Sequence, residues 1–154
     1  MNFSRKKHLI KVGRHTLPLF VAALLMTDSR THADEQSKET LYIITNRSVS
    51  IDDISVSDVV HIFKKDKTQI GGVKVFPFHA SKNSPLRAAF LSKVMNMSLS
   101  DETRYWEIQK IQNGRSPPSE VRDTLKAVFT MKKGISYCFA SQYKENIAKI
   151  LLKL

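Results

Sequence analysis

A ten-residue apolar run, 17–26, follows a basic amino-terminal segment and limits how much of the chain is left to fold. The first sixteen residues hold five lysines and arginines and no acidic residue. The run is half as long as the roughly 20 apolar residues that cross a bilayer, and it ends at Thr27. This pattern is typical of a secretory signal peptide. We therefore predict cleavage after Ala33 and a periplasmic protein beginning at Asp34. The alternatives are an uncleaved anchor and a buried helix, and the basic segment argues against the helix.

Removal of residues 1–33 changes the charge and the size of the protein. The segment carries six basic residues and one acidic residue, so the net charge falls from +11 to about +6. The remaining 121 residues suffice for one hydrophobic core but not for two lobes of ordinary size. We predict a flexible leader over 34–40 and a single domain over 41–154.

Several kinds of chemistry find little support in the sequence. Cys138 is the only cysteine, so it can form no intramolecular disulfide, and we expect it to be a small buried residue. After cleavage only His61 and His79 remain as histidines, without the spacing of metal ligands. No G-x-S-x-G motif and no phosphate-binding glycine loop occurs. We therefore predict neither an enzyme nor a protein with a metal or cofactor, and no specific nucleic-acid binding.

Strand and helix patterns alternate along the predicted domain. Apolar and β-branched runs predict strands, while helical spacing behind serine and proline starts predicts helices. The predicted strands are 41–44, 73–76 (ended by Pro77), 135–139 and 147–154, the last with a helical end as the alternative. The predicted helices are 57–63, 85–95, 100–113 and one opened by 116–118 that closes at 132–134. This alternation predicts an α/β fold with a small mixed sheet packed by helices.

Two of the predicted helices carry an expected buried face. Tyr105, Trp106, Ile108 and Ile111 would form the face of the helix that begins at Ser100. The helix that follows would bury a stripe of four apolar residues, namely Val121, Leu125, Val128 and Phe129.

The segment 81–87 has the composition of a small anion site. It is a polar loop between a strand and a helix start, where backbone N–H groups lack partners and the helix dipole is positive. The candidate ligand-binding residues are Lys82, Asn83, Ser84 and Arg87. The alternative is that Ser84 only caps the helix and that Arg87 is a solvated helix residue.

The order of these motifs resembles the phosphate-binding subunit of the phosphate ABC transporter. Within residues 41–154, the motifs that carry this likeness are Asp58-Val59-Val60-His61-Ile62-Phe63, the Ser84 helix start, Tyr105-Trp106, Pro117-Pro118 and Gly134-Ile135-Ser136-Tyr137. The chain looks more closely like short secreted phosphate transporter substrate-binding proteins. The resemblance implies a type 2 periplasmic-binding-protein fold reduced to one lobe, matching the second lobe of the full-length binder, with phosphate as ligand and an ABC transporter as partner.

The loop departs from the pattern of that family, which reads R-x-x-G-S-G-T. Only Ser84 matches; Ala80 stands where the family has its arginine, and Leu86 where it has threonine. Ala80 cannot form the bidentate contact of a guanidinium with phosphate, and Pro85 removes a backbone donor. Arg87 fits an arginine of the short relatives, and Lys82 supplies a point charge without fork geometry.

Three functions follow from these observations. The first is a periplasmic binder of phosphate or another small oxyanion. The second is an interaction module of the cell envelope that keeps the fold without a ligand. The third is non-specific binding of anionic lipid or nucleic acid by the basic surface, which would weaken steeply with salt.

Overall fold

The computed structural model describes residues 39–154. The predicted signal peptide and most of the predicted leader lie outside these residues. The helices and strands, in chain order, are β1 (Leu41–Asn46), α2 (Val56–Phe63), β2 (Gln69–Ile70), β3 (Val73–Lys74), β4 (Phe76–Ala80), α3 (Pro85–Phe90), η1 (Leu91–Met95), α4 (Leu99–Asn113), β5 (Ser119–Val121), α5 (Thr124–Thr130), β6 (Gly134–Phe139), η2 (Ala140–Gln142) and β7 (Ala148–Lys153).

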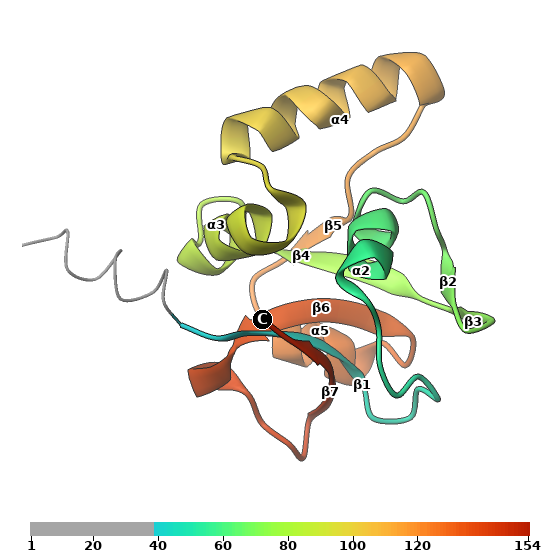
Figure 1. Cartoon of the computed structure of the whole chain (residues 1–154), viewed down its shortest axis with the longest axis vertical. Coiled ribbons are helices and arrows are strands. Elements are labelled where there is room, and N and C mark those ends of the chain that lie inside the picture. Colours follow the sequence, from blue (N-terminus) through green and yellow to red (C-terminus); the bar gives the residue numbers. More distant parts are fainter. Residues whose placement is uncertain (1–38) are drawn as a thin grey trace, which may run out of the picture.

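Five strands form one mixed sheet in the order β5-β4-β6-β1-β7 (Figure 1). β4 is parallel to both β5 and β6, whereas β1 is antiparallel to both β6 and β7. All six residues of β6 are buried, as expected for the central strand. The predicted α/β class with a small mixed sheet is confirmed.

Helices cover both faces of this sheet, with α2, α3 and η1 on one side and α5 on the other (Figure 1). Alternate residues of a strand point to opposite faces. Accordingly, Ile43 and Tyr137 belong to the core under α2 and α3, whereas their neighbours Ile44 and Cys138 pack with Val128 of α5. The described chain is therefore a three-layer α/β/α lobe.

The predicted helix 57–63 is confirmed as α2. Ser55 is its N-cap, and its hydroxyl oxygen accepts a hydrogen bond from the Asp58 N–H at 3.1 Å. Val59, Ile62 and Phe63 form the buried stripe. Such a cap contributes about 1 kcal/mol to helix stability.

The prediction that a strand ends at Pro77 is wrong, because β4 runs through this proline to Ala80. The Phe76 N–H donates to the Lys133 carbonyl oxygen at 2.8 Å, toward β6. On the other side of β4, pairing with β5 starts only at Phe78. Pro77 therefore lies where no partner strand requires the donor that proline lacks.

Part of the predicted strand 73–76 forms a separate hairpin. Val73 and Lys74 make up β3, which pairs with β2 in an antiparallel hairpin. Gly71 and Gly72 connect the two strands with φ angles of 55° and 79°. These positive values favour glycine at both positions of the turn.

The predicted helix 85–95 is confirmed as α3 followed directly by η1, a π-helical segment. Pro85 occupies the first turn and Ser84 the N-cap position, as predicted. The helix ends at Asn96, which adopts the left-handed conformation with φ 50°.

α4 begins earlier than predicted, because Ser98 and not Ser100 is its N-cap. The Ser98 hydroxyl oxygen accepts from the Asp101 N–H at 3.1 Å, and the Asp101 carboxylate accepts from the Ser98 N–H at 3.0 Å. This reciprocal capping box fixes the start of the helix. The helix ends at Gly114, as predicted.

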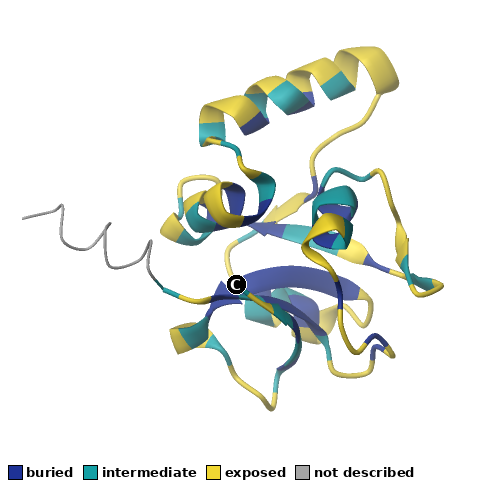
Figure 2. Ribbon diagram, in the orientation of Figure 1, coloured by how far each residue is buried: buried dark blue, intermediate teal, exposed yellow. Residues whose placement is uncertain are grey.

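The predicted apolar face of α4 is confirmed at Trp106 and is wrong at Ile108 and Ile111. Only Glu102 and Trp106 are buried in this helix, while Ile108 is 44% and Ile111 85% exposed. Figure 2 shows α4 as largely exposed, standing off from the sheet at its far end. A helix buries a stripe only where another element faces it, and no element among residues 39–154 covers the second half of α4.

The helix predicted to open at 116–118 is also wrong in its first part. Residues 119–121 form β5, which pairs with the edge of β4, and α5 begins only after its N-cap Asp123. The backbone partners that β4 offers override the helical spacing that includes Val121. Phe129, expected in the buried stripe, is 60% exposed.

The remaining predicted strands, 41–44, 135–139 and 147–154, are confirmed as β1, β6 and β7 with shifts of at most two residues at their ends. In residues 39–154 we find no helix with the length and apolar character that a membrane crossing requires.

Candidate functional site

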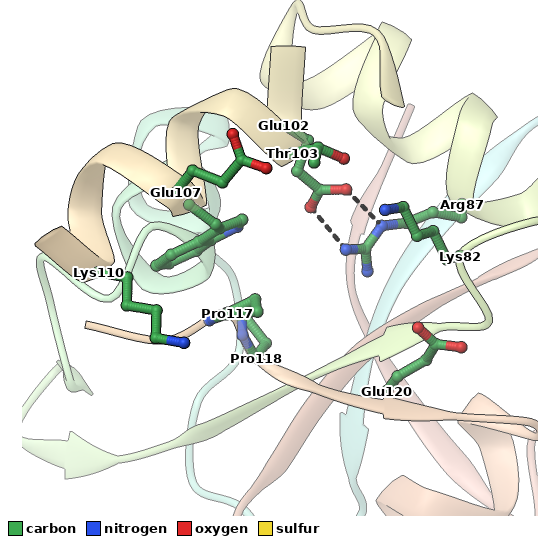
Figure 3. A pocket seen from close by; sticks show the side chains of 10 residues that line it. Lys82, Arg87, Glu102, Thr103, Glu107, Lys110, Pro117, Pro118 and Glu120 are labelled. Atoms are coloured by element: carbon green, nitrogen blue, oxygen red, sulfur yellow. Dashed lines mark hydrogen bonds and ion pairs between the residues drawn. The ribbon is translucent and has the colours of Figure 1, made fainter. Parts of the chain in front are cut away.

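Arg87 and Glu102 form a buried ion pair under α4. Arg87 lies on α3 and Glu102 in the first turn of α4, and each is 5% exposed. The Arg87 Nη2 donates to Glu102 Oε1 at 2.6 Å, and Nε donates to Oε2 at 3.1 Å (Figure 3). Two parallel charge-assisted hydrogen bonds are a strong and orienting contact. The pair therefore ties α4 to α3.

His79 on β4 and Tyr137 on β6 extend this pair into a buried network, and we call the four residues the Arg87 cluster. His79 Nε2 lies 3.5 Å from Glu102 Oε1, and His79 Nδ1 lies 3.1 Å from the Tyr137 hydroxyl. The Tyr137 hydroxyl oxygen also accepts from the Ala80 N–H at 3.1 Å. The cluster thus links β4, β6, α3 and α4.

The contacts within the Arg87 cluster assign its protons. The Glu102 carboxylate favours a proton on His79 Nε2, which leaves Nδ1 to accept from the Tyr137 hydroxyl. Burial raises the pKa of Tyr137 well above its ordinary value, so the hydroxyl keeps its proton. In the described part of the chain, each buried side-chain nitrogen and oxygen has a hydrogen-bond partner.

A pocket of about 430 Å³ opens beside the Arg87 cluster, between α4 and the segment that leads into β5 (Figure 3). Its lining consists of Lys82, Arg87, Glu102, Thr103, Trp106, Glu107, Lys110, Pro117, Pro118 and Glu120. Three of these side chains are basic and three are acidic, while Trp106 and the two prolines give an apolar surface. The pocket is therefore close to neutral and has an amphipathic wall.

The loop before α3 is ordered by hydrogen bonds within itself. The Ser84 hydroxyl oxygen accepts from the Arg87 N–H at 3.1 Å, and the Ser84 hydroxyl donates to the Ser81 carbonyl at 2.7 Å. The Ser84 N–H also donates to the Ser81 carbonyl, at 2.9 Å. Ser84 is therefore the helix cap, and its hydroxyl proton is already used within the loop.

The four residues predicted for ligand binding have different surroundings. Lys82 and Arg87 line the same pocket, and Lys82 is exposed. Arg87 is turned inward to Glu102 and is not a solvated helix residue. Asn83 is exposed and is not part of the pocket lining.

Several members of this site escaped the sequence analysis. Neither His79 nor Glu102 was predicted as a member of the site, yet both belong to the Arg87 cluster. A buried arginine needs an acidic partner, so the burial of Arg87 is the signal that would have pointed to Glu102. Trp106 was predicted to lie on a buried helix face, and Pro117 and Pro118 were noted only as a motif. Nothing in the sequence pattern places the three around one pocket.

Cys138 lies on the opposite face from the Arg87 cluster and is fully buried, as predicted. Burial raises the pKa of its thiol to about 12. No group of three or more histidine, cysteine or acidic residues within 39–154 has the arrangement of a metal site.

No family model and no curated protein matches the sequence. The solved structures that share the fold include the following three. An ABC-type phosphate transport receptor from Vibrio cholerae is 16% identical with a TM-score of 0.58, and the match covers 73% of this chain and 45% of the receptor. For a putative phosphate ABC transporter substrate-binding protein with bound phosphate from Clostridium perfringens, the identity is 14%, the TM-score 0.54 and the coverage 73% and 44%. For PstS from Borrelia burgdorferi, these values are 16%, 0.55, 73% and 46%.

These comparisons define the class of the fold. The described chain has the periplasmic-binding-protein fold of phosphate-transport proteins, as predicted from the sequence. It spans less than half of the length of each of these three structures, so it corresponds to a partial, lobe-sized unit of that fold. At identities of 14–16% the likeness establishes the fold, while function follows from the site itself.

Proposed function

We propose that this chain is an exported solute-binding lobe that holds a small oxyanion, with phosphate as the first candidate, in the pocket beside the Arg87 cluster. The observation that carries the proposal is the meeting of Lys82 and Arg87 in one pocket, on a fold shared with phosphate-transport proteins. Under this proposal residues 1–33 direct export to the periplasm, 34–40 form a leader, and 41–154 form the binding domain. An ABC transporter of the envelope is the expected partner.

Lys82 is the donor best placed for an incoming anion. Its side chain is exposed at the pocket, and it has no ion-pair partner among residues 39–154. Asn83 adds an exposed amide in the same loop. Ser84 contributes only if its hydroxyl gives up the bond to the Ser81 carbonyl. Because the pocket is open to water, charge contacts in it are screened, and binding is expected to be weak.

Isothermal titration with inorganic phosphate tests this proposal on the purified protein. We expect saturable binding that weakens in the variant Lys82→Ala and in the variant Ser84→Ala. Lys153→Ala is the charge-matched control, because Lys153 lies on β7 at the opposite edge of the sheet. Absence of any heat of binding at millimolar phosphate would overturn the proposal, as would equal losses in Lys82→Ala and Lys153→Ala.

A second candidate function is an interaction module without a small ligand. The observation that favours it is the pairing of Arg87 with Glu102, which occupies the guanidinium fork that a phosphate would use. The balanced charges and the apolar Trp106 wall of the pocket also suit a polypeptide better than a free anion. Recovery of a stable complex from envelope extracts, unchanged by added phosphate and lost in Trp106→Ala, would favour this function.

A further inference from the structure

Three exposed apolar side chains gather at the end of the sheet far from the pocket. Phe129 is 60%, Met131 44% and Phe76 40% exposed. Together with Lys74, Lys132 and Lys133 we call them the Phe76 patch. The three apolar members, Phe76, Phe129 and Met131, are half of the large hydrophobic residues that are exposed within 39–154. The others are Val56, Ile108 and Ile111.

Backbone contacts bring the members of the Phe76 patch together. Phe76 pairs with Gly134 across β4 and β6, and its N–H donates to the Lys133 carbonyl at 2.8 Å. The Gly134 N–H in turn donates to the Met131 carbonyl at 2.8 Å. Figure 1 shows β3, the start of β4 and the turn into β6 at the same side of the molecule.

The apolar members of the patch also share a face of the sheet. Phe76 and Phe78 are two residues apart on β4 and therefore point the same way. A methyl group placed on Gly134 would meet the Phe78 ring at 3.2 Å and the Met131 Cβ at 3.3 Å, so this face is the one covered by α5. Phe129 is in the last turn of α5, and its carbonyl oxygen accepts from Asn46 Nδ2 at 3.0 Å. Asn46 is the last residue of β1, next to Thr45, which pairs with Ile135 of β6.

Lysines surround these apolar side chains. The Lys74 ammonium lies 5.3 Å from the centre of the Phe76 ring, and Lys132 and Lys133 follow Met131 directly and are exposed. Within residues 39–154 none of the three lysines has an ion-pair partner. Their charge is therefore available to an anionic surface.

We propose that the Phe76 patch docks this protein on an anionic lipid surface. Exposed aromatic and aliphatic side chains beside unpaired lysines suit both regions of such a surface. The apolar tips enter the boundary of the acyl chains, and the ammonium groups contact the anionic headgroups. An acidic protein would satisfy the lysines but would also need a recess for each of the three projecting side chains. This inference does not depend on the proposed oxyanion site.

Vesicle flotation tests the proposal with the protein that begins at Asp34, because the basic and apolar residues 1–33 would themselves bind anionic vesicles. We expect binding to vesicles of phosphatidylglycerol mixed with phosphatidylcholine, and little binding to phosphatidylcholine alone. The double variant Lys132→Ala/Lys133→Ala should lower the partition coefficient roughly 30-fold. The control Lys93→Ala/Lys153→Ala removes the same charge near the other end of β1 and should change it less than threefold.

A second pair of variants tests the apolar contribution. Phe129→Ser should lose binding, whereas Phe129→Leu should keep it, and thermal melts should show both variants folded because Phe129 is exposed. Equal binding to both kinds of vesicle would overturn the proposal. So would a loss in the control pair as large as that in the Lys132 and Lys133 pair, or binding of an acidic protein partner by a patch that does not bind vesicles.

Discussion

Arg87 and Glu102 face each other through two hydrogen bonds, at 2.6 and 3.1 Å, and each side chain is almost completely removed from water. The pair is the main polar link between α4 and the rest of the lobe, since Glu102 and Trp106 are the only buried residues of that helix. The same pair occupies the guanidinium that an incoming oxyanion would seek. Under the proposed function, stability and oxyanion binding are therefore coupled at one contact.

Removal of one partner of this pair should strongly destabilise the protein. Arg87→Ala leaves the Glu102 carboxylate buried without a counter-charge, which we expect to lower the free energy of unfolding by about 3–5 kcal/mol in urea denaturation. Arg104→Ala, on the exposed side of α4, is the matched control and should change it by less than about 0.5 kcal/mol. Equal effects of the two variants would show that the ion pair does not stabilise the protein.

Neutralising Glu102 should favour an oxyanion at Arg87. In Glu102→Gln the guanidinium keeps a partner of similar shape but loses the competing negative charge, so phosphate should bind about tenfold more tightly than to the parent protein. The readout is the increase in melting temperature on addition of phosphate, which should be larger for Glu102→Gln. Glu107→Gln, at the same pocket but exposed, is the control. A smaller phosphate effect in Glu102→Gln than in the parent protein contradicts this coupling.

Loss of the Tyr137 hydroxyl should lower the free energy of unfolding, because two buried groups depend on it for a hydrogen bond. Tyr137→Phe leaves the Ala80 N–H and His79 Nδ1 without their partner in a buried site, at a cost of about 1–3 kcal/mol in unfolding free energy. Tyr143→Phe is a suitable comparison, since that hydroxyl donates one bond, to the Ala148 carbonyl, in a partly buried position. We expect a clearly smaller loss there, measured by urea denaturation of both variants.

The buried and the exposed apolar side chains of α4 should respond differently to substitution. Trp106→Ala removes the buried aromatic contact of the helix and should lower the free energy of unfolding by about 3 kcal/mol. Ile111→Ser, at a side chain that is 85% exposed, should be close to neutral. A large loss in Ile111→Ser would mean that the second half of α4 is covered in solution. Thermal and urea melts of the two variants provide the measurement.

The layered fold could be predicted from local patterns, because a few consecutive residues suffice to indicate a strand or the start of a helix. The Ser84-Pro85 pair marked a helix start correctly, and β6 was recognisable from five apolar or small residues in a row. The predictions were wrong where contacts with residues distant in the sequence determine the secondary structure or the burial. Residues 119–121 pair with β4 although their spacing favoured a helix, and Ile111 lies on a helix face that nothing covers.

The candidate site was harder to predict because its chemistry depends on burial. The sequence identifies Arg87 as a cation near a helix start, but it does not indicate that the side chain turns inward to meet Glu102, fifteen residues later. His79 and Tyr137, which complete the Arg87 cluster, come from strands that are neighbours only after folding. The sequence pattern thus identified the loop and Lys82. Only the folded structure shows that the Glu102 carboxylate would compete with an anion for Arg87.

Cys138 should be inert until the protein unfolds. Its thiol is fully buried, and burial raises its pKa to about 12, so at pH 8 only about one thiol in ten thousand is the reactive thiolate. Reaction with a thiol reagent such as dithionitrobenzoate should therefore be very slow for the native protein. In urea the pKa returns to its ordinary value, and the reaction should become fast and speed up further as the pH rises from 7 to 9. The labelling rate at low urea should follow the unfolding equilibrium measured by circular dichroism, and Arg87→Ala should increase it. Rapid labelling of the native protein, unaffected by that destabilising variant, would show that the face between α5 and the sheet opens without unfolding.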